Sequence, residues 1–240
     1  MASPPFRFKR FEIRQDAAVH PAGTDSVLLG AWAPVSPDCR ILDVGTGTGI
    51  VALMLAQRTE LFDNVLITGV ELDEPTARCA AANFAASPWA TRLSVVCKSV
   101  QELAGDSAES FDLIVSNPPF FSETVVSPDT RRRLGRNTDT LRPGAFLAAA
   151  ESLLRPAGKL AVILPPVEAR RLCEMAVPLG LYCTVETAVR ARSDKPVERC
   201  LLLLERVPHR FRREALSIYE TGEVYTSDYQ QLTSDFYLFF

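Results

Sequence analysis

Short apolar, β-rich runs alternate with helical segments along most of this chain. Such alternation is typical of a parallel sheet whose strands are joined by crossover helices. The first five runs are nearly continuous in apolar residues, as expected for strands that are buried on both faces. The five runs are Arg40–Val44, Val65–Val70, Leu93–Cys97, Phe111–Ser116 and Lys159–Leu164.

Two later runs, Tyr182–Val189 and Arg199–Arg206, have only a loop between them and predict an antiparallel hairpin. We therefore expect an α/β fold: a doubly wound, mostly parallel, seven-stranded sheet with an antiparallel edge hairpin. Residues 1–39 are expected to form an arm, 40–206 the core and 207–240 a tail packed on it, within one domain. Helices are expected at Ile50–Arg58, Glu74–Ala86, Gly144–Leu154 and Val167–Leu179.

The composition narrows the class of protein. With 47% apolar and 23% charged residues, the 240-residue chain fits a globular protein with a sizeable core. No apolar stretch is long enough to span a bilayer, and the start has no apolar signal segment. Six widely spaced cysteines without a Cys-x-x-Cys pair suit reduced thiols in the cytoplasm. Two isolated histidines do not suggest a metal site, and a net charge of −3 does not by itself favour nucleic acid.

A glycine-rich turn follows the first strand, with Gly45, Gly47 and Gly49 leading into a helix. Glycines permit tight turns and close approach of a ligand to the main chain, and nucleotides commonly bind at this turn. The spacing is Gly-x-Gly-x-Gly, unlike that of dinucleotide folds. Glu71 ends the second strand, where a carboxylate can accept hydrogen bonds from both hydroxyls of a ribose. A solvated carboxylate at a helix start is the alternative for Glu71, but turn and carboxylate together predict a nucleoside ligand.

A proline turn follows the fourth strand, in the order Asn117, Pro118, Pro119, Phe120. Two consecutive prolines fix φ and disfavour the helical region for the residues before them. The stiff turn aims an amide and main-chain carbonyls, with an aromatic ring beside them. A plain loop is the alternative, but the turn suits a planar group that bears an –NH2.

Together these motifs resemble the class I S-adenosylmethionine-dependent methyltransferases that modify amino groups, from about His20 to Arg206. The arm Phe6–Phe11, the segment Gly23–Trp32 and the ending Tyr225–Tyr237 are similar to those of bacterial tRNA1(Val) adenine-N6 methyltransferases. The resemblance covers nearly the whole chain. It implies methyl transfer from S-adenosylmethionine to the N6 amine of the adenosine next to the anticodon of tRNA1(Val).

The resemblance also implies roles for individual residues. Asn117 and the Pro118 carbonyl would accept the two amine hydrogens, Phe120 would stack on the base, and Phe121 would form a second wall. Core packing is the alternative for both rings. The residues expected to contact the cofactor are Thr24, Asp25, Asp43, Gly45, Gly47, Gly49, Glu71, Ser99, Val100 and Asn117.

Several of these cofactor contacts have alternatives. Asp43 can instead support the turn, and Thr24 or Asp25 can act as an ordinary helix N-cap. Many class I enzymes have an acidic residue after the third strand, whereas this chain has Ser99 and Val100 there. The usual carboxylate contact to the adenine is therefore in doubt.

RNA binding needs local positive charge, which the arm and one loop supply. Lys9 and Arg10 stand among aromatic residues of the arm, and a cluster of arginines follows the proline turn. Interleaved cations and rings can hold phosphates and stack unpaired bases, although a charge cluster is more often a solvated face. The predicted RNA contacts are Lys9, Arg10, Phe121, Arg131, Arg132, Arg133 and Arg136.

Other functions share parts of this pattern. Protein glutamine methyltransferases also use an Asn-Pro-Pro turn, but they typically carry Tyr where this chain has Phe120, and a separate amino-terminal domain. Ribosomal guanine-amine methyltransferases share the turn and often have a duplicated domain, for which this chain is too short. A binding-only module leaves Asn117 and Phe120 unexplained, and the glycine spacing disfavours a nicotinamide-dependent oxidoreductase. A monomer is expected.

Overall fold

The computed structural model describes residues 5–15, 23–106, 110–118 and 141–240. Its centre is an eight-stranded sheet with the order β10-β8-β9-β7-β6-β3-β4-β5. The strands are β3 (Arg40–Val44), β4 (Leu66–Glu71), β5 (Leu93–Cys97), β6 (Phe111–Ser116), β7 (Leu154–Leu164), β8 (Tyr182–Arg192), β9 (Val197–Glu205) and β10 (Arg212–Tyr219).

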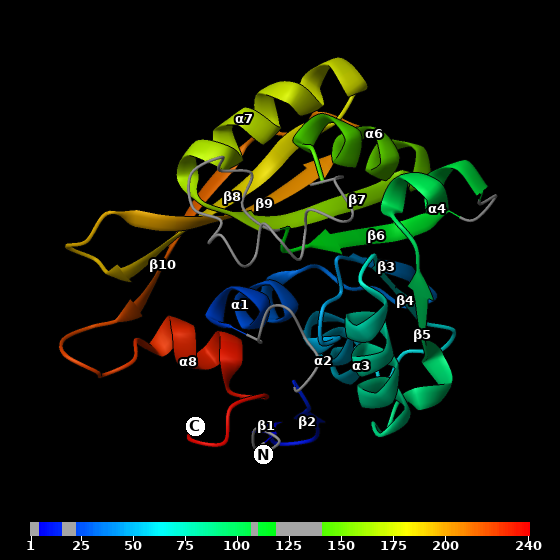
Figure 1. Cartoon of the computed structure of the whole chain (residues 1–240). Coiled ribbons are helices and arrows are strands. Elements are labelled where there is room, and N and C mark those ends of the chain that lie inside the picture. The colour runs from blue at the N-terminus through cyan, green and yellow to red at the C-terminus, as the bar shows by residue number, and fades with distance from the viewer. Residues whose placement is uncertain (1–4, 16–22, 107–109, 119–140) are drawn as a thin grey trace, which may run out of the picture.

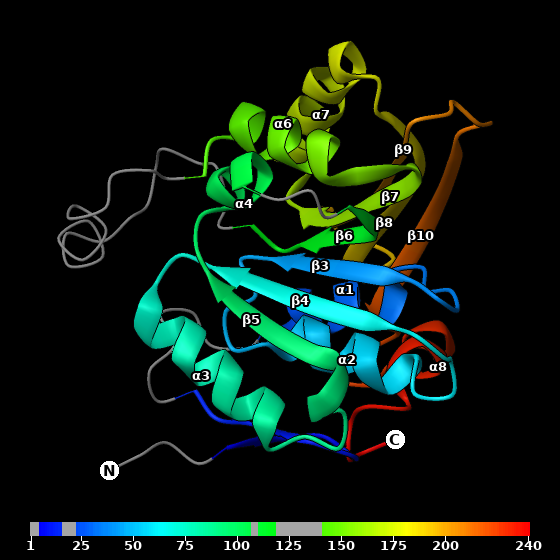
Figure 2. The ribbon, with the colours of Figure 1, turned by 90° about the vertical axis from the view of Figure 1, so that its right-hand side faces the viewer.

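Helices cover both faces of this sheet, as expected for a doubly wound fold (Figures 1 and 2). One face carries α1, α2, α3 and α8, and the other carries α4, α6 and α7. The helices are α1 (Thr24–Trp32), α2 (Ile50–Arg58), α3 (Glu74–Ala85), α4 (Val100–Asp106), α6 (Pro143–Leu153), α7 (Pro166–Ala176) and α8 (Ser227–Thr233), with short 3-10 turns at Ala90–Arg92 and Val177–Leu179.

The core is divided by the sheet into two apolar layers, because successive side chains of a strand point to opposite faces. Ile41 and Val115 belong to the layer beneath α1 and α2. Leu42 and Ile114, their chain neighbours, belong to the layer beneath α6 and α7. The inner strands are buried on both sides and have continuous apolar runs, as predicted. The prediction is wrong for Leu93–Cys97, because β5 is an edge strand and none of its residues is buried.

The predicted class and the predicted antiparallel hairpin are confirmed, since β9 runs antiparallel to both β7 and β8. The predicted count of seven strands is wrong by one. The tail supplies β10, which pairs in parallel with β8 at the sheet edge. Its first residues, Arg212, Arg213 and Glu214, are charged and exposed, so the apolar pattern of a buried strand is missing.

The arm and the end of the tail lie side by side (Figures 1 and 2). Strands β1 (Phe6–Arg7) and β2 (Glu12–Ile13) form a small hairpin. The Lys9 N–H donates to the Phe236 carbonyl at 2.9 Å. Phe8 and Phe11 are buried against the helices of the α1–α2 face, so both rings belong to the core.

Candidate active site

Three neighbouring strands bring the predicted motifs to one edge of the sheet. In the strand register, Val70 of β4, Val44 of β3 and Ser116 of β6 lie side by side. The next residues on these strands are Glu71, Gly45 and Asn117. The glycine-rich turn therefore lies between the acidic residue and the proline turn.

The glycine-rich turn leaves open space on one side. Gly45 and Gly47 have φ values of 69° and 57°, in the left-handed region that favours glycine. A Cβ added at Gly45 would meet no atom within 4 Å, and one at Gly47 would meet only the Gly45 carbonyl, at 3.9 Å. Gly49 differs, because a Cβ there would collide with the Phe84 ring. The first two glycines leave room for a ligand, whereas the third permits packing of α3.

Asp43 lies beneath this turn and is 2% exposed. Its Oδ2 accepts hydrogen bonds from Thr46 Oγ1 at 2.7 Å and from the Ala52 N–H at 3.2 Å. Burial raises the pKa of the Asp43 carboxyl to about 7. These contacts match the alternative in which Asp43 supports the turn.

Glu71 already binds the main chain of the turn. Its Oε2 accepts from the Gly47 N–H at 3.1 Å, and its Oε1 accepts from the Asp73 N–H at 3.0 Å. The carboxylate is thereby held at the carboxyl end of β4 next to the open glycines. It is an anionic acceptor at the position where the sequence predicts a ribose.

Ser99 caps α4 in a reciprocal arrangement with Glu102. The Ser99 hydroxyl accepts from the Glu102 N–H at 3.1 Å, and the Glu102 carboxylate accepts from the Ser99 N–H at 2.8 Å. This capping box satisfies two main-chain donors at the helix start. The Val100 side chain is buried, and its N–H belongs to the first turn, where amides have no partner within the helix. The Val100 N–H is therefore the main-chain donor left at this end of β5, because the Glu102 carboxylate and the Ser99 N–H are bonded to each other.

Asn117 is held by a residue that the sequence analysis did not identify. The Asn117 Nδ2 donates to Ser26 Oγ on α1 at 3.1 Å. Its Oδ1 accepts no hydrogen bond within the described part of the chain. The preceding residue, Ser116, is fully buried and donates through Oγ to the Val44 carbonyl at 2.8 Å, which fixes the end of β6 against β3. The amide therefore presents an acceptor, and Pro118 follows it as a buried residue.

Thr24 and Asp25 open α1, but neither caps it. The N-cap is Gly23, which makes no side-chain cap bond. The Asp25 Oδ2 accepts from Arg199 Nε at 2.7 Å and so ties the start of α1 to β9. Thr24 is exposed at the same helix start, two residues before Ser26, the partner of Asn117.

The cations of the arm are used within the chain. Lys9 Nζ donates to the Ser234 carbonyl at 2.7 Å and to the Phe240 carbonyl at 2.9 Å. Arg10 pairs with Glu60 and lies 5.6 Å from the centre of the Trp89 ring. These contacts favour a structural role for both. The other predicted substrate contacts lie outside the described residues, namely Phe120, Phe121, Arg131, Arg132, Arg133 and Arg136.

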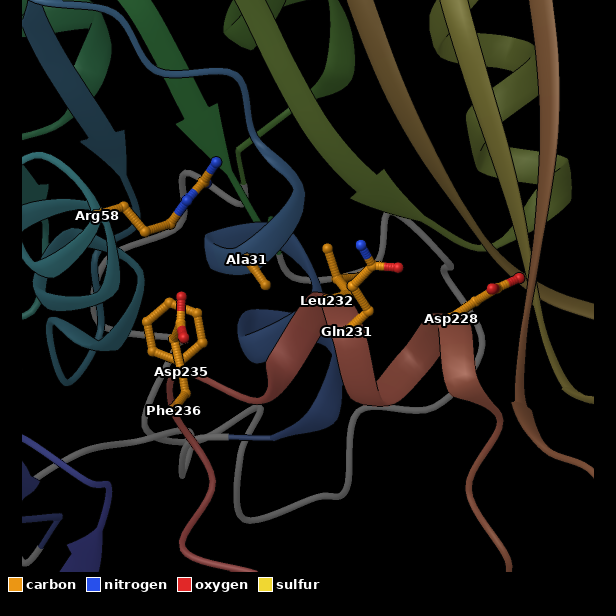
Figure 3. A pocket seen from close by; sticks show the side chains of 7 residues that line it. All are labelled: Ala31, Arg58, Asp228, Gln231, Leu232, Asp235 and Phe236. Carbon is orange, nitrogen blue, oxygen red and sulfur yellow. The ribbon is translucent and has the colours of Figure 1, made fainter. Parts of the chain in front are cut away.

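A polar cavity of about 450 Å³ lies between α1 and α8, away from this edge (Figure 3). Arg58 and Asp235 lie at one end of it, and Asp228 lies at the other. Arg58 Nη1 donates to the Gly30 and Ala33 carbonyls at 2.9 and 2.6 Å, so it closes the carboxyl end of α1. Within the described residues, no cluster of His, Cys, Asp or Glu can hold a metal, and no helix is long and apolar enough to cross a membrane.

Comparison with known proteins agrees with this geometry. The model of the Methyltransferase small domain family matches residues 23–172. In the solved structure of a predicted O-methyltransferase, Atu636 from Agrobacterium tumefaciens, the fold superposes with a TM-score of 0.67 at 19% identity, over 88% of this chain and 96% of that one. At this identity the likeness concerns the fold.

Two curated relatives are more specific. The tRNA1(Val) (adenine(37)-N6)-methyltransferase of Tolumonas auensis is 42% identical over 233 residues, 97% of this chain and 96% of that protein. The enzyme of the same name from Bacteroides fragilis is 36% identical over 239 residues, 99% of each. The chain thus belongs to the tRNA1(Val) (adenine(37)-N6)-methyltransferase family.

Proposed function

We propose that this protein methylates the N6 amine of adenosine 37 in tRNA1(Val), as the names of its relatives state for them. The observation that carries the proposal is the Asn117 amide, anchored to Ser26 with its Oδ1 available, beside the open glycine turn. The reaction belongs in the cytoplasm with its tRNA, and the enzyme acts as a monomer.

The residues present fit S-adenosylmethionine as the methyl donor. Open space beside Gly45 and Gly47 adjoins the Glu71 carboxylate, and the Val100 N–H lies after the end of β5, next to Ser99. S-adenosylmethionine supplies an electrophilic methyl group on a positively charged sulfur. Glu71 would hold the ribose hydroxyls, and Thr24 and Asp25 would close over the donor at the start of α1.

Asn117 and Pro118 would orient the acceptor. The lone pair of an adenine amine is delocalised into the ring, so the amine is a poor nucleophile. By accepting the two amine hydrogens, the Asn117 Oδ1 and the Pro118 carbonyl would favour a pyramidal nitrogen that faces the methyl group. Held in this way, the nitrogen would face the methyl group that the donor supplies, and the proton of the methylated amine would leave to solvent after transfer. Orientation and exclusion of water supply the rate, without a strong base.

Methyl transfer to RNA tests the proposal directly. With a tritiated donor and unmodified tRNA transcripts, we expect N6-methyladenosine only in tRNA1(Val). Asn117→Ala is expected to abolish transfer and leave the affinity for S-adenosylhomocysteine nearly unchanged. Label in another base, in ribosomal RNA or in a protein glutamine would contradict the assigned acceptor. Binding of NAD in place of S-adenosylhomocysteine would contradict the whole proposal.

A further inference from the structure

A second cavity, of about 520 Å³, lies at the amino-terminal end of α1 and is lined by aromatic rings. We propose that it binds an unpaired nucleobase next to the methylated adenosine in the RNA strand, an inference that rests on the proposed function. The volume is in the range of small-molecule sites. Its lining includes Thr24, Arg190, Tyr219, Tyr225, Tyr237 and Phe239.

The aromatic wall is a column of near-parallel rings. Tyr219 stacks on Tyr225 with ring centres 4.9 Å apart. Tyr225 also stacks on Tyr229 at 5.3 Å and on Phe239 at 5.6 Å. Phe239 in turn stacks on Tyr237 at 4.8 Å. Within the described residues, Tyr219 contacts a single ring, so it ends the column. Every base has a π face, and a base stacked on Tyr219 would extend this column.

The topology places the cavity beside the catalytic turn. Strands β8 and β10 run parallel to β7 and β6, so their carboxyl ends reach the edge that carries Asn117. The cavity is lined by the ends of both strands and by the first two residues of α1, Thr24 and Asp25. The third residue of α1, Ser26, bonds Asn117. The cavity therefore adjoins the helix start that holds Asn117, and Figure 1 shows the β8–β9 hairpin and α8 on one side of α1.

Two arginines, Arg190 and Arg199, also line the cavity. Arg190 Nη1 donates to the Ser193 carbonyl at 3.4 Å, and its Nε is buried away from the cavity surface. Arg199, on the same wall, is already paired with Asp25.

The same observations disfavour two other occupants. The ribose of the methyl donor is expected at Glu71 and Gly45 on β4 and β3, which β6, β7 and β9 separate from the β8 and β10 ends. Thr24 and Asp25, at the start of α1, are the residues that the donor site and the cavity would share. A phosphate is disfavoured because Glu198 lines the cavity and Glu220 and Glu223 follow Tyr219. A wall of aromatic rings fits a base better than a phosphate.

A fluorescent adenine analogue tests the proposal without catalysis. It is placed on either side of the target adenosine in an anticodon stem–loop of tRNA1(Val). We expect binding to quench the analogue at one of these positions, because stacking quenches such bases. Tyr219→Leu should remove the quenching and Tyr219→Phe should keep it. Phe211→Leu, at the exposed opposite end of β10, is the matched control.

Steady-state kinetics provide a second test of the proposal. Tyr219→Leu should raise the KM for the stem–loop roughly 5- to 150-fold, the range expected for one lost stack. An abasic nucleotide at the quenched position should raise the wild-type KM by a similar factor and add nothing in the variant. Retained affinity for S-adenosylhomocysteine shows that the variant is folded. Unquenched analogue at both positions, or additive losses in KM, would overturn the proposal. If quenching occurs but no RNA is methylated, the proposed function fails and the base site stands.

Discussion

Asp43 makes the stability of this fold depend on pH. Its pKa is raised from 3.8 to about 7 by burial, and both of its hydrogen bonds end on Oδ2, so Oδ1 can carry the proton. Because the folded pKa exceeds the unfolded value, unfolding releases a proton between the two. The contribution of Asp43 to the free energy of unfolding is fully present below about pH 4 and is lost as the pH rises to about 7. The shift in the pKa corresponds to a change in this free energy on the order of 4 kcal/mol.

We expect Asp43→Asn to remove this loss of stability. The measurement is the free energy of unfolding in urea at intervals from pH 4 to 8, for wild type and variant. Glu102 and Glu205 have lowered pKa values, so they make the free energy of unfolding rise with pH in both the wild type and the variant. The difference between the two curves therefore isolates the effect of Asp43. Parallel curves would show that Asp43 does not carry the effect.

Ser26 is expected to act as a positioning residue for Asn117. Ser26→Ala removes the acceptor of the Asn117 Nδ2 and lets the amide rotate. A net hydrogen bond is worth roughly 1 kcal/mol, so we expect kcat to fall about 3- to 10-fold, with the KM for tRNA nearly unchanged. Ser26→Thr, which keeps the hydroxyl, is the control and should retain most of the rate. An equal loss in both variants would point to packing instead.

Among individual site residues, Glu71, Gly45 and Asn117 could be predicted from sequence to lie side by side, because each stands at the carboxyl end of a recognisable apolar strand. It does not predict the Ser26–Asn117 bond, whose partners are 91 residues apart. A serine in the first turn of a helix has no distinctive pattern. From sequence, Asp43 could either contact the cofactor or support the glycine-rich turn. In the structure its two hydrogen bonds go to residues of the turn and of α2.

Between elements, the arm is fastened to the tail through Lys9. Its two bonds to the Ser234 and Phe240 carbonyls join segments from opposite ends of the sequence. Lys9→Ala should lower the free energy of unfolding by about 1 kcal/mol, the value of an exposed bond of this kind, and leave RNA affinity close to that of wild type. Thermal denaturation and RNA titration measure the two effects. Arg7→Ala, on the same arm with only a 3.8 Å contact to Glu12, is the control.

A large loss of RNA affinity in Lys9→Ala, greater than in Arg7→Ala, would restore the RNA contact predicted from sequence. The difference between that prediction and the structure has a simple cause. Alternating cations and aromatic rings fit an RNA surface and a folded arm equally well. The buried faces of Phe8 and Phe11 become visible only once the tail is in place.

The elements themselves were predictable to different degrees. The central strands follow from apolar runs, and β3, β5 and β6 have the predicted bounds. Strand β10 was not predictable in this way, because one of its neighbours is solvent and its first half is charged. The density of aromatic residues after Tyr219 was the available signal for a packed tail.

For the whole molecule, a net charge of −3 means that RNA affinity must come from local basic surfaces. Replacing Arg131, Arg132 and Arg133 with Ala is expected to weaken tRNA binding and to reduce the slope of log affinity against log salt by up to about 2. Replacing Arg210, Arg212 and Arg213 changes the net charge equally but near the amino end of β10. An identical salt slope in both triple variants would mean that only total charge matters.

The strand order places the reaction centre on inner strands of the sheet, away from the outer edge formed by β10. The row of Glu71, Gly45 and Asn117 rests on β4, β3 and β6, where a one-residue slip of register would carry every buried side chain to the wrong face. Strand β10 is an outer edge of the same sheet, and its first four residues are exposed. Changes of side chain there would leave the buried register of β4, β3 and β6, and with it the reaction centre, in place.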